Sequence, residues 1–168
     1  MAFIIENNQV VSFAEYADVV NRDQRLFDNN EGLTDDAIEP LLERATQRIV
    51  TRLSNTDWYK SNWINQTGSA VSNSSQIPQL NPNWILARTE DFVDLCVYTA
   101  LAEYILPSIA DFGNKENAEV NKIGFYGSKA EALFGELIAA GDWYDWSGNG
   151  TITAKEKNPG IINLKRVR

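Results

Sequence analysis

The sequence has no histidine, only one cysteine and fewer basic than acidic residues, and each shortage excludes functions. Without histidine the chain lacks the Ser-His-Asp and Cys-His nucleophile systems and the commonest zinc ligand. The lone Cys96 cannot form an internal disulfide, and its position in the apolar run FVDLCVYTALAEYIL predicts a buried thiol. The net charge of −8 argues against a nucleic-acid-binding body, which needs a basic face.

Long apolar runs and catalytic motifs are also missing. No stretch approaches ~18 uninterrupted apolar residues, so we expect no membrane span. The N-terminal MAFIIENNQ has too short an apolar run and no basic flank for a signal peptide. Acidic pairs occur at 35–36 and 90–91, but both stand at predicted helix starts, where helix capping explains them. We therefore expect no enzyme, and no cofactor apart from one calcium alternative.

Apolar residues at helical spacing dominate the rest of the chain. With 168 residues and 43% hydrophobic content, the chain is expected to form one domain, residues 1–168, with a real core. The spacing predicts a mainly α fold, a small helical bundle with a long irregular arm and an extended C-terminal tail. The predicted helices cover 13–21, 35–53, 89–106 and 114–140, with a capping box at Ser12 and Glu15, a stop at Pro107 and a C-cap at Gly141.

No residue between Lys60 and Arg88 carries a charge, and this stretch (61–88) is the predicted arm or loop. It is too polar for a core, and loops longer than ~15 residues are usually functional or disordered. Such an arm with a few apolar anchors suits binding along another protein, for example as an added strand. A surface loop is the alternative. The anchors are Trp63, Ile77, Leu80 and Trp84.

The segment DWSGNGTITAKE, residues 145–156, has the ligand spacing of an EF-hand calcium loop. The oxygen donors in that pattern are Asp145, Ser147, Asn149, Thr151 and Glu156. However, only two of the five are charged, the incoming helix is predicted to end early at Gly141, and no second loop exists to form a pair. The alternative is a tight turn in which Asp145 and Asn149 accept hydrogen bonds from their own backbone.

Two parts of the chain resemble a known protein family. The segment LTDDAIEPLLERATQRIVTRL (33–53), after an N-terminal helical segment, resembles the opening of head–tail adaptor proteins of tailed bacteriophages, also called connector or head completion proteins. The ending resembles theirs too, with a helix followed by GDWYDWSGNGTIT (141–153) and the basic INLKRVR (162–168). The resemblance implies a mainly helical subunit of a ring, commonly of about twelve copies, beneath the portal. The stretch 61–87 has no counterpart in the family pattern.

The resemblance also implies partners and a location. The chain would be a virion protein of the neck, made in the host cytoplasm, that binds the portal protein, other neck or tail proteins and copies of itself. DNA would pass through the ring without sequence-specific binding, because an acidic wall repels phosphate. On this hypothesis the turn and basic tail (142–168) dock onto the portal or a neighbouring subunit. The docking residues are Lys165, Arg166, Arg168, Trp143, Tyr144 and Trp146. The three aromatic residues could instead pack the tail onto the bundle.

Two other functions stay open. One is a protein-binding module stabilised by calcium in the 145–156 loop. The other is a different neck component, a stopper or a tail terminator. Those proteins tend to be rich in β-structure, whereas the helical periodicity here is strong, so the adaptor hypothesis is favoured.

Overall fold

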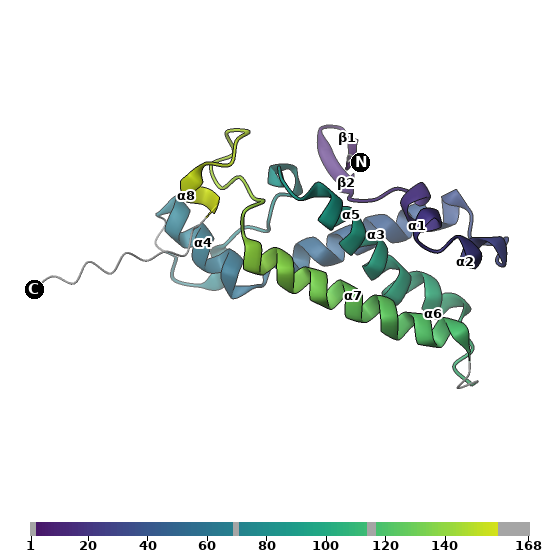
Figure 1. The fold of residues 1–168 in the computed structure, drawn as a ribbon. Coiled ribbons are helices and arrows are strands. Elements are labelled where there is room, and N and C mark those ends of the chain that lie inside the picture. The colour runs from purple at the N-terminus through teal and green to yellow at the C-terminus, as the bar shows by residue number, and fades with distance from the viewer. Residues whose placement is uncertain (1–2, 69–70, 114–116, 158–168) are drawn as a thin grey trace, which may run out of the picture.

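The computed structural model describes residues 3–68, 71–113 and 117–157. In these ranges the chain is mainly helical, with one two-stranded antiparallel sheet, so the predicted fold class is confirmed (Figure 1). The elements are β1 (Ile4–Glu6), β2 (Gln9–Ser12), α1 (Tyr16–Arg22), α2 (Gln24–Asp28), α3 (Asp35–Ser54), α4 (Asp57–Thr67), η1 (Ser74–Gln76), η2 (Pro82–Trp84), α5 (Thr89–Ala100), η3 (Leu101–Ile105), α6 (Leu106–Ile109), α7 (Ala118–Ala140) and α8 (Ala154–Lys157).

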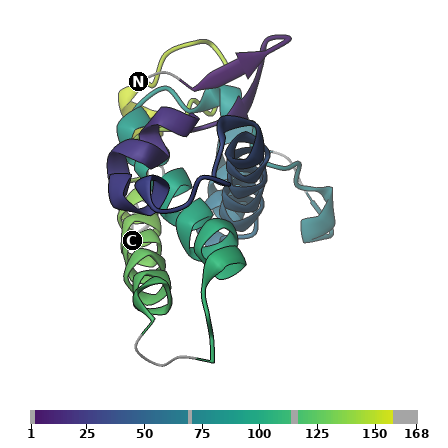
Figure 2. The same cartoon turned by 90° about the vertical axis from the view of Figure 1, so that its right-hand side faces the viewer.

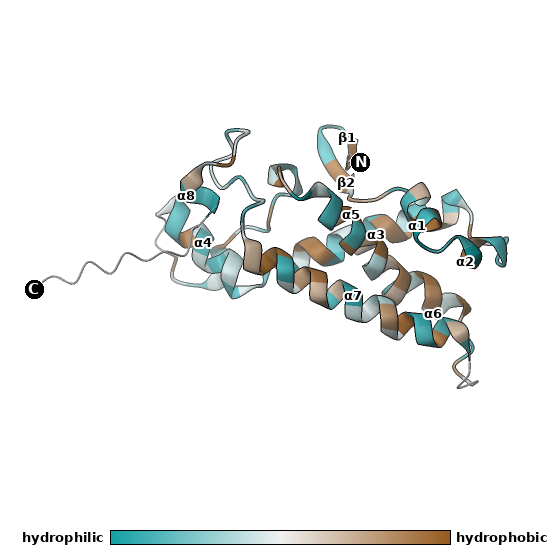
Figure 3. Cartoon of the chain, viewed as in Figure 1, coloured by the Kyte–Doolittle hydropathy of each residue, from teal (hydrophilic) through white to brown (hydrophobic). Residues whose placement is uncertain are grey.

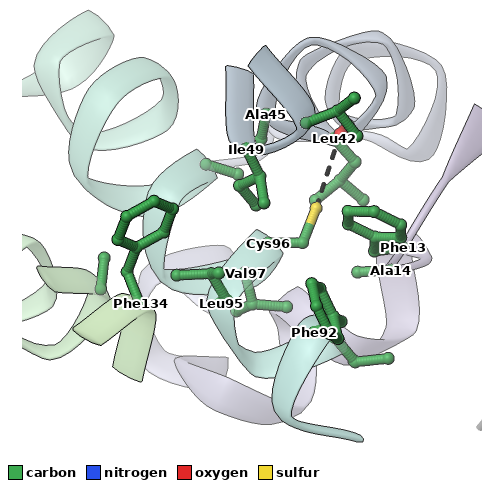
Figure 4. Packing of buried hydrophobic residues seen from close by; sticks show 14 of the residues in the cluster. Phe13, Ala14, Leu42, Ala45, Ile49, Phe92, Leu95, Cys96, Val97 and Phe134 are labelled. Atoms are coloured by element: carbon green, nitrogen blue, oxygen red, sulfur yellow. Dashed lines mark hydrogen bonds between the residues drawn. The ribbon is translucent and has the colours of Figure 1, made fainter. Parts of the chain in front are cut away.

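The core lies where α5 and η3 pack between α3 and α7 (Figures 1 and 2). These central helices carry most of the strongly apolar positions, whereas α2 is largely hydrophilic (Figure 3). Cys96 is fully buried, as its apolar run predicts, and its Sγ donates to the Leu42 carbonyl at 3.5 Å (Figure 4). Burial raises the pKa of the Cys96 thiol to about 11, so the thiol is protonated and inert at neutral pH.

The core helix continues past the predicted stop at Pro107. It runs without a break from Thr89 to Ile109, with Pro107 two residues after the π-helical turn η3. Inside a continuous helix a proline removes one backbone hydrogen bond, and the π-turn shifts the hydrogen-bond register just before it. By length and composition this helix could cross a membrane, since its most apolar 18-residue stretch has a mean hydropathy of 1.4. However, 61% of that stretch is buried inside the fold. A buried core helix gives this result without a membrane.

The first predicted helix starts later than expected. Residues 13–15 are not helical, since Phe13 lies in a bend and Glu15 has an extended backbone, and α1 begins at Tyr16. The observed capping box joins Glu15 to Asp18, whereas Ser12 ends strand β2. This non-helical path of residues 13–15 lets Phe13 enter the core, where its ring centroid lies 5.4 Å from that of Phe92. Burial of a large aromatic side chain outweighs the local capping signal.

The last predicted helix is a single continuous element. Helix α7 runs without interruption from Ala118 to Ala140, and Gly141 ends it with a left-handed φ of 58°. Residues 61–67, predicted as part of the irregular arm, belong instead to α4. The Thr56 hydroxyl caps this helix by accepting from the Tyr59 N–H at 3.2 Å. The arm prediction is therefore wrong for its first seven residues.

Candidate functional site

The residues after α7 fold back onto the body through a cluster of five aromatic side chains. We call Trp58, Tyr59, Trp143, Tyr144 and Trp146 the aromatic cluster. The Trp143 ring is 0% exposed and lies 5.0 Å from Trp58 and 4.9 Å from Phe92, measured between ring centroids. Its indole N–H donates to the Leu137 carbonyl at 2.7 Å. Tyr144 and Trp146 are also buried. The expectation that these aromatics are exposed docking anchors is wrong, and they pack the turn onto the bundle.

The second half of the predicted arm, residues 77–88, forms a strap across the same end of the body. Its backbone pairs with the chain after α7, since the Leu86 N–H donates to the Trp143 carbonyl at 3.0 Å. In return the Asp145 N–H donates to the Trp84 carbonyl at 2.9 Å. Ile85 and Tyr144 form an isolated antiparallel bridge. The strap therefore forms its extended pairing with its own chain. Binding of this segment along another protein stays a prediction.

Polar side chains fix the strap at specific points. The Asn83 side chain accepts from the Val10 N–H at 2.8 Å and donates to the Asn8 carbonyl at 3.0 Å, which ties the strap to the β1–β2 hairpin. The Leu80 N–H donates to the Ser54 hydroxyl at 2.9 Å. Of the predicted anchors, Leu80 is buried, Trp63 and Ile77 are partly buried against the core, and Trp84 is 39% exposed.

An ion pair joins the end of the strap to the residue after α7. The Arg88 Nε lies 2.5 Å from Asp142 Oδ1 and its Nη2 lies 3.1 Å from Oδ2. This hydrogen bond holds the pKa of the Asp142 carboxyl below its usual range. Both side chains are more than a third exposed, so solvent screening leaves the pair a small contribution to stability. The pair mainly holds the end of the strap beside the residue after α7. Arg88 itself has a left-handed backbone, with φ of 54°.

The Asp145–Glu156 loop is a hydrogen-bonded turn. Asp145 Oδ2 accepts from the Gly150 N–H at 2.7 Å, and Oδ1 accepts from the Gly148 and Ser147 N–H groups at 2.8 and 3.1 Å. Glu156 accepts from the Ser147 N–H at 2.9 Å and from the Thr153 N–H at 2.7 Å. Burial alone would raise both pKa values, but these hydrogen bonds outweigh it, and the pKa of each carboxyl lies below its usual value.

The remaining predicted calcium ligands also bond within the turn. The Ser147 hydroxyl donates to Asp145 Oδ1 at 3.0 Å, and Asn149 Oδ1 accepts from the Thr151 N–H and hydroxyl at 2.9 and 2.8 Å. The turn alternative, in which Asp145 and Asn149 bond their own backbone, is confirmed. Over the described residues, no group of three or more His, Cys, Asp or Glu side chains could hold a metal ion. Calcium binding by the two carboxylates stays a prediction.

Exposed large apolar side chains occur mainly in two unlike places. One is the corner between α6 and α7, where Phe112 and Phe125 are 66% and 57% exposed. The other is the hairpin and strap, with Ile5, Trp84 and Leu86 at 61%, 39% and 41%. The hairpin lies at the top of Figure 2 and the α6–α7 corner at the bottom. Exposed large apolar side chains in these two regions are candidate contact points for another protein.

Three predicted docking residues, Lys165, Arg166 and Arg168, lie outside the described residues. The sequence analysis also missed Trp58 and Asn83. Their residue types are visible in the sequence, but nothing local indicates that they meet the turn and the hairpin. In comparisons with known proteins, no protein family, no curated protein and no solved structure matches this chain.

Proposed function

We propose that this chain is a subunit of the head–tail adaptor ring of a tailed bacteriophage. The ring would lie beneath the portal and extend the DNA channel towards the tail. Its partners would be the portal protein, other neck or tail proteins and further copies of the same chain, in the neck of a virion assembled in the host cytoplasm. The role is structural and needs no catalysis.

The observation that carries the proposal is the exposure of large apolar side chains in two unlike regions, the α6–α7 corner and the hairpin with the strap. A closed ring requires two different faces that meet head to tail around a rotation, whereas a two-fold dimer uses one face twice. Phe112 and Phe125 are aromatic, whereas Ile5 and Leu86 are aliphatic, and the two groups belong to different parts of the chain. The segments that resemble the adaptor family, 33–53 and 141–153, correspond to α3 and to the turn after α7.

The acidic face of α3 is a second supporting feature. Asp35, Asp36, Glu39 and Glu43 are at most partly buried, and none forms an ion pair with another described residue. The charge of Asp35, with smaller effects of burial and the other two acids, raises the pKa of Glu39. This face carries uncompensated negative charge, and such a surface lets phosphates slide past without binding.

The native mass of the purified chain tests the proposal. We expect assemblies of about twelve copies of the 18.9 kDa chain, roughly 230 kDa, to form as the concentration rises. Negative-stain images of that species should show a ring with an open centre. A monomer at every concentration, or a dimer that stops growing, would contradict a self-assembling ring. The same series in calcium and in chelator separates the adaptor from a calcium-stabilised binding module.

A further inference from the structure

An open groove of about 840 Å³ lies between the α2–α3 connection, the start of α3 and the end of α6. Its lining includes the apolar residues Leu33, Ala37, Ile38, Leu41 and Ile109. It also includes two carboxylates, Asp28 and Glu31, and both residues are exposed. None of the described residues that line the groove is a lysine or an arginine. The groove therefore suits a ligand that combines apolar and basic side chains.

The C-terminal sequence of this chain has that combination. Residues 161–168 read IINLKRVR, with two isoleucines and a leucine followed by Lys165, Arg166 and Arg168. The apolar side chains suit the apolar residues that line the groove, and the three cations have charges opposite to those of Asp28 and Glu31. Opposite charges at the rim of an interface fix the register and suppress wrong partners.

The tail cannot reach the groove of its own chain. Helix α8 lies at one end of the molecule and α2 and α6 lie at the other, with α7 running between them (Figure 1). The 23 residues of α7 span about 34 Å at the rise of an α-helix. Leu164 stands seven residues after Lys157, so even a fully extended chain carries it only about 25 Å. Residues 161–164 of the same chain therefore cannot fill the groove, and a second copy is the other source of this segment.

We propose that the α2–α3–α6 groove binds residues 161–168 of a neighbouring copy of this chain. The inference rests on the proposed ring and specifies one of its contacts. A donor site at one end of the subunit and an acceptor site at the other make a head-to-tail contact, which closes into a ring when the rotation permits. The tail also links neighbours through a segment separate from the two regions of exposed apolar side chains.

Disulfide trapping between two variants, each with one introduced cysteine, tests this contact. Ser108→Cys places a thiol in the groove at an exposed position, and Asn163→Cys places one in the tail of a second copy. Native Cys96 is buried and does not compete. After mild oxidation of the mixed full-length variants, we expect a covalent heterodimer. Ser128→Cys, exposed on α7 outside the groove, is the matched control, and its yield with Asn163→Cys should be several-fold lower.

A charge reversal gives an independent measurement. Glu31→Lys in the groove lining should lower the trapping yield several-fold, whereas Glu136→Lys, an exposed acid on α7, should leave it unchanged. Equal yields from the Ser108 and Ser128 mixtures would overturn the proposal, and so would equal effects of the two reversals. Rings that form normally without residues 161–168 would overturn the tail contact but leave the adaptor proposal intact. Trapped pairs without closed rings would support the contact and contradict the adaptor.

Discussion

Replacement of Asp145 by asparagine distinguishes a hydrogen-bonded turn from a calcium site. In the structure both carboxylate oxygens accept backbone N–H groups, Oδ2 from Gly150 at 2.7 Å and Oδ1 from Gly148 at 2.8 Å. Asparagine keeps the shape but only one acceptor oxygen, because its amide nitrogen is a donor. One of these two N–H groups is therefore left facing another donor in a buried position.

The size of the effect follows from that lost acceptor. A hydrogen bond to a charged group contributes about 1.5–3 kcal/mol, so we expect Asp145→Asn to lower the free energy of unfolding by about 2 kcal/mol. In a domain of this size, that corresponds to a fall in Tm of about 4–8 °C. The loss should be the same with calcium in excess and with EGTA, because the lost partners belong to the backbone.

Thermal unfolding followed by far-UV circular dichroism measures both conditions. Asn149→Ala is the matched control, since Asn149 is exposed and its side chain bonds only Thr151. We expect this variant to change the stability by no more than about 0.5 kcal/mol. A wild-type Tm that rises with calcium, and a loss of that rise in both variants, would refute the turn and establish a metal site, because a calcium loop uses both positions as ligands.

Three further predictions concern pH, reactivity and backbone strain. Because folding lowers the pKa of Asp145 and Glu156, the stability they contribute is present above about pH 4 and is lost as the pH falls through their folded values. Urea unfolding of wild type and Asp145→Asn at a series of pH values should show that the difference between their free energies of unfolding shrinks in acid. A difference that stays constant with pH would contradict this. Cys96 should react with a thiol reagent only in denaturant, and fast labelling of the native protein would show that it is accessible. Gly124→Ala should raise the free energy of unfolding by about 1 kcal/mol by improving α7. Gly148→Ala should lower it by at least about 1–2 kcal/mol, because φ is 66° and the new Cβ would lie 3.0 Å from Trp84; equal signs for the two glycines would refute this argument.

Features encoded by nearby residues could be predicted from the sequence. The α3 start after Thr34 and the C-cap at Gly141 each depend on residues within a few positions, and the apolar run around Cys96 is enough to predict that its thiol is buried. The Asp145 turn is equally local, because its carboxylate bonds N–H groups two to five residues ahead. For these features, the spacing of residue types is enough to specify the contact.

The features that the sequence analysis missed depend on distant partners. Asn83 accepts from a backbone N–H 73 positions earlier, so a neutral polar stretch that looks like a free arm is fixed to the hairpin. Trp143 is buried because Trp58 and Phe92 lie beside it in the folded chain. A tryptophan near a chain end has the same local pattern whether it is buried or exposed. Only the tertiary structure decides between the two.

The strap also has a consequence for synthesis on the ribosome. Its Asn81 N–H donates to the hydroxyl of Tyr144, which is 63 positions later in the chain. At about 5–20 residues per second, Asn81 of the strap is made roughly 3–13 s before Tyr144, and Tyr59 roughly 4–17 s before it. During that interval Tyr59, Leu80 and Ile85, all buried in the finished protein, have no partner from the C-terminal turn. The nascent chain therefore presents apolar surface long enough for chaperones that bind such surface to engage it.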